Sequence, residues 1–403
     1  MNAYSSQGRT AWSVFWIFLR LGLTSFGGPV AHLGYFRDEF VARRQWLSER
    51  SYADLVALCQ FLPGPASSQV GMAIGLSRCG YAGALAAWAG FTLPSAAALM
   101  LLAGGMHAYG DRVPVSAMHG LKVVAVAVVA QAVWNMARAL CPDTPRRLMM
   151  AATASFVLWL PFAWSQVLVI AVAALVGLLW LRPAGSPATE DLAVSVTRRA
   201  GVLWLSMFFL LLIGLPLAAA VFPGQTLALV DAFYRAGSLV FGGGHVVLPL
   251  LQAETVASGW IDNDMFLAGY GAAQAVPGPL FTFAAFLGAA MNQAPTGWSG
   301  GQICLLAVFA PSFLLVAGVW PFWRQLRRNS RVQAMLLGVN AAVVGLLLAA
   351  LYRPVWTSAI DSLQDVALAG LALLALMRWR LPPWLVVLGC DLFGAFATML
   401  WSA

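Results

Sequence analysis

Two arginines lie within apolar sequence at matching places in the two halves of the chain. Arg20 stands six residues before a Phe-Gly-Gly triplet at 26–28, and Arg235 stands six residues before the same triplet at 241–243. A guanidinium inside a membrane is costly and is retained where it faces a partner or an aqueous path. Its planar fork also binds oxyanions through two parallel hydrogen bonds. The pair would suit a tetrahedral dianion; snorkelling to the interface or pairing with a carboxylate is the alternative.

Each arginine precedes two motifs that interrupt a helix, Phe-Gly-Gly and Pro-Gly-Pro. A helix broken at membrane depth exposes backbone N–H groups, and the N-terminus of the half-helix that follows attracts anions. Hydroxyl and amide side chains beside the breaks, Ser25 and Ser68 among them, would complete the shell of an oxyanion. Packing alone is the alternative role of the glycines and prolines. The expected substrate-binding residues are Arg20, Gly27, Gly28, Gln60, Pro63, Gly64, Pro65, Ser67, Arg235, Gly242, Gly243, Gln274, Pro277, Gly278, Pro279 and Thr282.

Four titratable side chains are candidates for carrying a coupled proton. Glu39 and Glu254 are the acidic pair that recurs at matching positions, and a repeated carboxylate beside an anion path would relay protons or pair with an arginine. His32 and His245 follow the two Phe-Gly-Gly motifs, out of register by two residues, and histidine titrates near neutrality. Structural roles, as capping or loop charges and as packed histidines, are the alternatives.

The motifs belong to a repeat that extends through the chain. Residues 18–28 and 233–243 share six identities at identical spacing. The matches continue in order with Glu39 and Glu254, Trp46 and Trp260, the two Pro-Gly-Pro triplets, Pro94-Ser95 and Pro311-Ser312, and Gly120 and Gly338. Collinear similarity of this kind indicates an internal repeat. We therefore divide the chain into a first transmembrane repeat (1–181), a polar linker with an unpaired transmembrane helix (182–226), and a second transmembrane repeat (227–403).

The composition requires lipid as the solvent of most of this chain. Of 403 residues, 61% are hydrophobic and 9% are charged, and the mean hydropathy is +0.80. The sequence predicts an all-α polytopic membrane protein of about 13 segments, two inverted repeats of six joined by one extra helix. The segments expected are 11–33, 53–76, 80–106, 115–139, 147–162, 164–181, 200–222, 227–250, 264–290, 300–320, 334–352, 362–378 and 382–401.

The distribution of arginines favours re-entrant segments at the motifs. If every segment spans from a cytoplasmic N-terminus, the basic loop with Arg37, Arg43, Arg44 and Arg50 falls outside, against the positive-inside rule. The equivalent loop at 251–263 has no Lys or Arg and would fall inside. Both loops change side if the first two segments of each half are hairpins bent at Phe-Gly-Gly and Pro-Gly-Pro. We therefore expect broken or re-entrant helices there.

Several function classes have no support in the sequence. No Walker A, Gly-x-Ser-x-Gly or HExxH pattern is present, and the five cysteines form no Cys-x-x-Cys pair or Cys/His cluster. We expect no enzyme activity, no cofactor and no metal site. The net charge of +8 comes from basic residues scattered between apolar segments, so a nucleic-acid partner is not expected.

The motifs resemble those of the chromate ion transporter family in its long, two-domain form. The resemblance rests on the stretches 26–37, 45–47, 60–65, 241–245 and 274–279. Pro29 follows the first Gly-Gly where Gly244 follows the second, so the two sites need not be equivalent.

This resemblance implies a secondary active transporter that exports chromate across a bacterial inner membrane. Such a protein would confer chromate resistance and draw on the proton-motive force. Its partners would be chromate, chemically similar sulfate, protons and membrane lipids, with a homodimer as a further option. A transporter of sulfate or another oxyanion and a passive anion channel are the alternatives.

Overall fold

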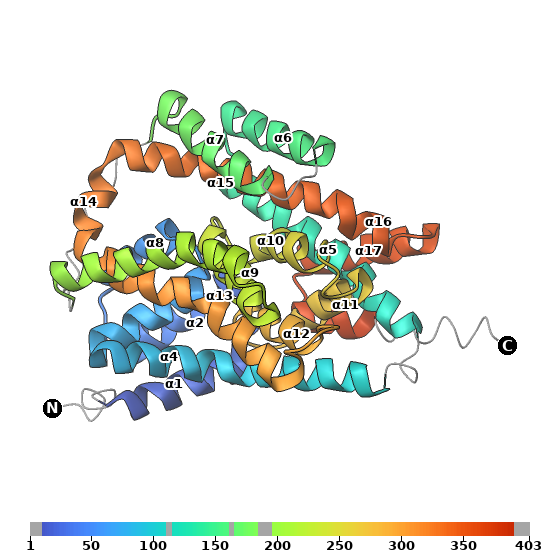
Figure 1. The fold of residues 1–403 in the computed structure, drawn as a ribbon, viewed down its shortest axis with the longest axis horizontal. Coiled ribbons are helices and arrows are strands. Elements are labelled where there is room, and N and C mark those ends of the chain that lie inside the picture. Colours follow the sequence, from blue (N-terminus) through green and yellow to red (C-terminus); the bar gives the residue numbers. More distant parts are fainter. Residues whose placement is uncertain (1–9, 110–114, 161–164, 184–195, 391–403) are drawn as a thin grey trace.

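The computed structural model describes residues 10–109, 115–160, 165–183 and 196–390, which form helices and connecting segments without a strand (Figure 1). The first half contains α1 (Ala11–Thr24), α2 (Gly28–Arg37), η2 (Asp38–Arg43), α3 (Glu49–Phe61), α4 (Ala66–Tyr109), α5 (Val115–Leu140), α6 (Thr144–Trp159) and α7 (Ser165–Trp180). The helix α8 (Arg198–Val221) follows.

The second half repeats this order in shorter pieces. It contains α9 (Gln225–Leu239), η4 (Gly244–Val246), α10 (Val247–Thr255), α11 (Asn263–Ala273), η5 (Leu280–Thr282), α12 (Phe283–Ala289), α13 (Gly297–Val319), η6 (Trp320–Phe322), α14 (Trp323–Arg328), α15 (Ser330–Ala350), η7 (Leu351–Trp356), α16 (Thr357–Ala359) and α17 (Leu363–Met377). These bounds confirm the all-α polytopic class. Most of the expected linker at 182–199 and of the last segment at 382–401 lies outside the described residues.

The helices break at the motifs, as the sequence predicts. At Phe-Gly-Gly, Gly27 has φ 101° and Gly242 has φ 75°. At Pro-Gly-Pro, Gly64 has φ 121° and Gly278 has φ 106°. Positive φ of this size is open to glycine and strained for other residues, so the glycine at each motif permits the break. The broken helices of the predicted fold class are therefore confirmed.

The chain doubles back at each Phe-Gly-Gly break. In the first half, the ring of Phe18 on α1 lies 5.5 Å from Phe36 and 5.1 Å from Phe40. A continuous helix would separate Phe18 from Phe36 by about 27 Å, because each residue adds about 1.5 Å. In the second half, Arg235 on α9 is hydrogen-bonded to Glu254 on α10. The segments after the breaks therefore run back along α1 and α9.

A further reversal follows each Pro-Gly-Pro motif. Within α4, Cys79 and Gly80 leave helical geometry, and a Cβ on Gly75 would lie 2.2 Å from the carbonyl oxygen of Gly83. Only a chain folded back on itself places residues 75 and 83 in backbone contact. The same approach joins α12 to α13, where a Cβ on Gly288 would lie 2.2 Å from the oxygen of Gly300. Both halves thus contain a tightly packed helical hairpin after the Pro-Gly-Pro break.

The packing separates a buried centre from helices whose apolar sides are exposed. Figure 1 shows α6 and α7 beside α15, while α1 and α4 run together along the opposite side. The described residues include helices long and apolar enough, by length and composition, to cross a membrane: Ala66–Ala108, His119–Leu140, Arg198–Val221, Gly297–Arg328 and Ser330–Ala359. The most apolar stretch of α8 is 6% buried, whereas the most apolar stretch of Gly297–Arg328 is 78% buried. Helix α8 therefore belongs at the lipid boundary.

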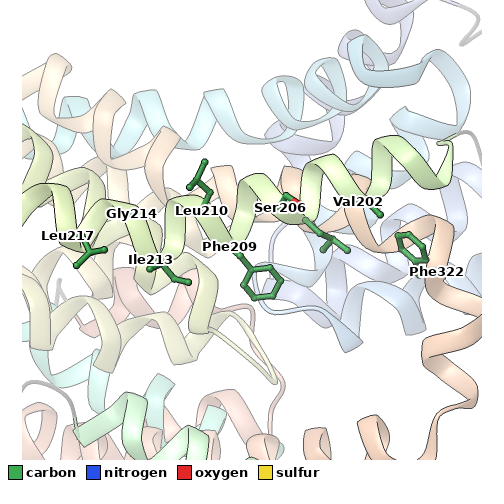
Figure 2. A pocket seen from close by; sticks show the side chains of 9 residues that line it. Val202, Ser206, Phe209, Leu210, Ile213, Gly214, Leu217 and Phe322 are labelled. Carbon is green, nitrogen blue, oxygen red and sulfur yellow. The ribbon is translucent and has the colours of Figure 1, made fainter.

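The exposed side of α8 forms an apolar groove of about 770 Å³. Figure 2 shows Phe209, Ile213 and Leu217 along it, with Phe322 at one end. Its lining carries no charged side chain, so it offers nothing to a dianion. A site for an anion has to be found in the buried centre.

Candidate functional site

The four breaks lie together because backbone hydrogen bonds join the breaks of one half to those of the other half. The backbone N–H of Gly64, in the first Pro-Gly-Pro, donates to the carbonyl of Val240, just before the second Phe-Gly-Gly, at 2.7 Å. The backbone N–H of Gly278, in the second Pro-Gly-Pro, donates to the carbonyl of Ser25, just before the first Phe-Gly-Gly, at 3.0 Å. This reciprocal exchange relates the halves by an approximate two-fold arrangement. We call the region around these two bonds the crossing.

Two further sets of contacts complete the crossing. A Cβ on Gly64 would lie 2.7 Å from the hydroxyl of Ser312, and a Cβ on Gly278 would lie 2.8 Å from the hydroxyl of Ser95. The repeated Pro-Ser pair within α4 and α13 therefore packs on the Pro-Gly-Pro motif of the opposite half. A larger residue at 64 or 278 would displace these hydroxyls and would also be strained by the positive φ at both positions.

The two Phe-Gly-Gly breaks also face each other. A Cβ on Gly244 would lie 3.5 Å from Cγ of Pro29. These two residues are the repeat equivalents that differ, Pro in one half and Gly in the other. Equivalent residues that touch lie near the approximate two-fold axis, which places the axis between the two Phe-Gly-Gly breaks.

Several buried polar atoms at the breaks have no hydrogen-bond partner among the residues that the structure describes. They are Ser25 Oγ, His32 Nε2, Ser68 Oγ, Thr92 Oγ1 and Gln274 Nε2. A buried polar group without a partner costs about 1–3 kcal/mol, and such groups are few in native proteins. Their concentration at the crossing indicates a place that takes a polar ligand.

His32 joins several parts of the first half. Its Nδ1 lies 3.3 Å from the hydroxyl of Ser67 at the start of α4, and its ring meets the ring of Phe91 edge-on with centroids 5.2 Å apart. Its side chain is 1% exposed. His32, on α2, therefore contacts both the start and the later part of α4.

The second half has a different polar arrangement. His245 Nδ1 lies 2.8 Å from the hydroxyl of Tyr270. The hydroxyl of Thr282 donates to the carbonyl of Pro279 at 2.7 Å. The equivalent of Gln274 in the first half, Gln60, is exposed. The two halves therefore present unlike side chains to the crossing.

Arg235 is held by two carboxylates. Its Nη1 donates to Glu254 Oε1 at 2.6 Å, and its Nη2 donates to Asp231 Oδ2 at 2.7 Å. The Arg235 side chain is 18% exposed. One guanidinium and two carboxylates carry a net charge of −1 if both acids are ionised, so Arg235 does not present an uncompensated positive charge. Asp231, one helical turn before Arg235, is the signal in the sequence that predicts this pairing.

Arg20 has different surroundings. Its side chain is exposed on α1. The equivalent of Glu254, Glu39, is bonded instead to Arg43 at 3.0 Å and to Arg44 at 2.6 Å. Arg20 and Arg235 are equivalent in sequence but not in their partners, and binding of one ion by both remains a prediction.

A buried ion pair between the halves was not expected from the sequence. Asp54 on α3 accepts hydrogen bonds from Arg327 and from Trp323 Nε1, both on α14. The side chains of Asp54 and Arg327 are 3% and 11% exposed. Neither residue lies in a repeated motif, so the repeat gave no signal for it. Together with the crossing, this pair ties the first half to the second.

These features define a class of protein: a helical, multi-pass membrane protein with broken helices at the interface of two repeats. No group of three His, Cys, Asp or Glu that would hold a metal ion is found in the part of the chain that the structure describes.

The chain belongs to the chromate transporter family. The sequence model of that family matches it twice, over residues 12–178 and 227–395. The chain is 27% identical to a probable chromate transport protein of Synechococcus elongatus, over 90% of this chain and 88% of that one. It is 28% identical to a chromate transport protein of Pseudomonas aeruginosa, over 94% of this chain and 90% of that one.

A shorter relative matches part of the chain. YwrA of Bacillus subtilis, an uncharacterized transporter, is 29% identical over 40% of this chain and 92% of its own length. No solved structure matches the chain.

Proposed function

We propose that this protein is a secondary active transporter that exports chromate from the cytoplasm, confers chromate resistance and is driven by the proton-motive force. Membership of the chromate transporter family and the names of its full-length relatives support chromate as the cargo. One structural observation supports the mechanism most strongly. The four helix breaks of the two halves meet at a buried crossing that contains unpartnered polar atoms.

The crossing is suited to an oxyanion by its backbone as well as its side chains. Helix α2 begins at Gly28 and α4 begins at Ala66, both beside the breaks. The N-terminus of a helix carries a partial positive charge and free N–H groups, so it stabilises a nearby anion. The predicted binding residues at the motifs, with the neighbouring hydroxyls and amides, would complete the site.

Transport by alternating access requires the two halves to move relative to each other. The bonds from Gly64 to Val240 and from Gly278 to Ser25 are the backbone contacts at which this motion would occur. Both are single hydrogen bonds between segments in non-helical conformations. Rearranging them would open the crossing without unfolding a helix.

Among the four candidates for the coupled proton, Glu254 has the clearest structural support. It shares Arg235 with Asp231, so Arg235 keeps a counter-ion when Glu254 is protonated. A proton can therefore be taken up without leaving a buried guanidinium unpaired. Glu39, His32 and His245 remain candidates for the same role.

The proposal is tested with labelled chromate in inside-out membrane vesicles energised by respiration. We expect chromate to accumulate, the accumulation to collapse with an uncoupler, and excess sulfate to compete. Vesicles without the protein give the background. Equilibration without accumulation would support a passive anion channel instead. Absence of chromate flux together with sulfate flux would replace chromate by sulfate as the cargo.

A further inference from the structure

The unpartnered polar groups at the crossing are concentrated in the first half. Ser25 lies before the first Phe-Gly-Gly, His32 lies on α2, and Thr92 lies two residues before the Pro-Ser pair of α4. Aligning the repeats on these motifs gives their equivalents in the second half, which are Val240, Val247 and Phe309. Three buried polar side chains are thus replaced by three apolar ones. The backbones of the two halves are related by an approximate two-fold arrangement, but these three polar side chains lie in the first half alone.

Contacts between neighbouring residues bring the three polar residues together in space. The ring of His32 packs on Phe91, the residue before Thr92, and its Nδ1 lies 3.3 Å from the hydroxyl of Ser67. The carbonyl of Thr92 accepts a hydrogen bond from Ser95, which packs on Gly278. Gly278 in turn donates to the carbonyl of Ser25. These contacts connect Thr92 to Ser25 through Ser95 and Gly278, and they place His32 against the residue beside Thr92.

The hydroxyl of Thr92 is free where such hydroxyls are usually bonded. A buried Ser or Thr in a helix commonly donates to the carbonyl four residues earlier. Thr255 does so, to Leu251 at 2.8 Å, and Ser238 does so, to Tyr234 at 2.8 Å. Thr92 is as fully buried as Thr255, yet its hydroxyl has no partner in the described part of the chain. Ser25 Oγ and His32 Nε2 are also without one.

We propose that the transported oxyanion is bound by Ser25, His32 and Thr92, in a single site on the first half beside the N-terminus of α4. This inference rests on the proposed function and assigns its ligand site. The hydroxyls and the imidazole N–H supply hydrogen bonds to a tetrahedral oxyanion, and the start of α4 supplies a partial positive charge. The site is closed to solvent in this conformation, so the ion enters when the crossing opens.

In this proposal Arg235 has a structural role. Its guanidinium already has Glu254 and Asp231 as partners, so it ties α10 to α9 and positions the second half. In this proposal Arg235 is not a ligand of the ion, and this role replaces the predicted contact of both arginines with one ion. The apolar side chains of Val240, Val247 and Phe309 then form the face that covers the site from the second half or leaves it during transport.

The test is equilibrium binding of labelled chromate, and separately of labelled sulfate, to the purified full-length protein in lipid nanodiscs. The variants are Ser25→Ala and Thr92→Val, each of which removes one hydroxyl with little change of volume. Thr255→Val is the matched control, because it removes an equally buried hydroxyl outside the site. His32→Leu removes the imidazole, and His32→Gln returns an amide N–H near the position of Nε2. Thermal melting verifies that each variant is folded.

We expect Ser25→Ala and Thr92→Val each to weaken anion binding about tenfold or more, since a hydrogen bond to a charged group is lost. Thr255→Val should bind as the unaltered protein does, and His32→Gln should bind better than His32→Leu. Wild-type affinity in folded Ser25→Ala and Thr92→Val would overturn the inference and leave the proposed function standing. Failure of the unaltered protein to bind either anion would instead overturn the proposed function, and this inference with it.

Discussion

At the scale of residues, Arg20 and Arg235 show that equivalent positions in the two repeats can have different partners. Arg235 has Asp231 one turn before it, whereas the position equivalent to Asp231 in the first half is Trp16. The carboxylate pair therefore forms around Arg235 and not around Arg20. The repeat predicts where both arginines lie, but their partners depend on neighbours that the repeat does not share.

This difference predicts unlike consequences of neutralising the two arginines. Arg235→Gln leaves Asp231 and Glu254 without their cation. Because the Glu254 side chain is 28% exposed, we expect a loss of stability below the ~3–5 kcal/mol of a fully buried ion pair. We expect lower thermal stability and loss of transport, with part of the stability recovered when Glu254→Gln is added. Arg20→Gln removes an exposed charge, which is expected to change stability by less than about 0.5 kcal/mol. It should still abolish transport if Arg20 lies on the anion path.

Melting of the purified proteins and chromate transport in vesicles measure these two effects separately. A stable Arg235→Gln protein would show that the carboxylates have other partners. Normal chromate resistance conferred by Arg20→Gln would remove Arg20 from the path.

At the scale of elements, the sequence predicts where helices break but not what the breaks touch. Glycine between two prolines predicts a helix break and permits the positive φ of Gly64 and Gly278, and most described helices begin and end within a few residues of the expected segments. The exchange of hydrogen bonds between halves has no local signal, because a backbone N–H carries no information about its partner. The unpartnered hydroxyl of Thr92 was not predicted either, because Thr92 lies in no repeated motif.

The hairpin within α4 gives a prediction about a single methyl group. Gly75→Ala places a Cβ about 2.2 Å from the carbonyl oxygen of Gly83, a backbone atom that cannot move aside. Overpacking of this kind costs about 1–3 kcal/mol. Gly104→Ala, on the same helix, meets no atom within 4 Å, and should be neutral or stabilise by up to about 1 kcal/mol. Thermal melting in detergent compares the two, and equal melting temperatures would contradict a folded-back α4.

At the scale of the whole molecule, the two halves are interlocked instead of lying side by side. The crossing exchanges backbone bonds, Asp54 pairs with Arg327, and Lys122 on α5 pairs with Asp264 on α11 at 3.1 Å. Such links allow one half to move only by rearranging specific contacts with the other. That is the behaviour required of a transporter whose site opens to one side at a time.

The repeat leads to an expectation about the whole molecule, namely that the two equivalent loops lie on opposite sides of the membrane. The loop before α3 carries Arg37, Arg43 and Arg44, whereas the equivalent loop after α10 carries no Lys or Arg. Hairpins at the breaks place the first loop in the cytoplasm and the second outside, in accord with the positive-inside rule. The doubling back of α2 along α1 and of α10 along α9 supports hairpins of this kind.

Cysteine labelling in intact cells tests this sidedness directly. Ser48 and Ser258 are exposed residues in the two loops, and Cys79 is the one partly exposed native cysteine. In a Cys79→Ser background, we expect Ser258→Cys to react with an impermeant thiol reagent added outside. Ser48→Cys should react only after the membrane is permeabilised, because its loop faces the cytoplasm. Labelling of both sites from outside would place the loops on one side, which two inverted repeats cannot do, whereas the reversed pattern would keep the inversion and remove the re-entrant hairpins.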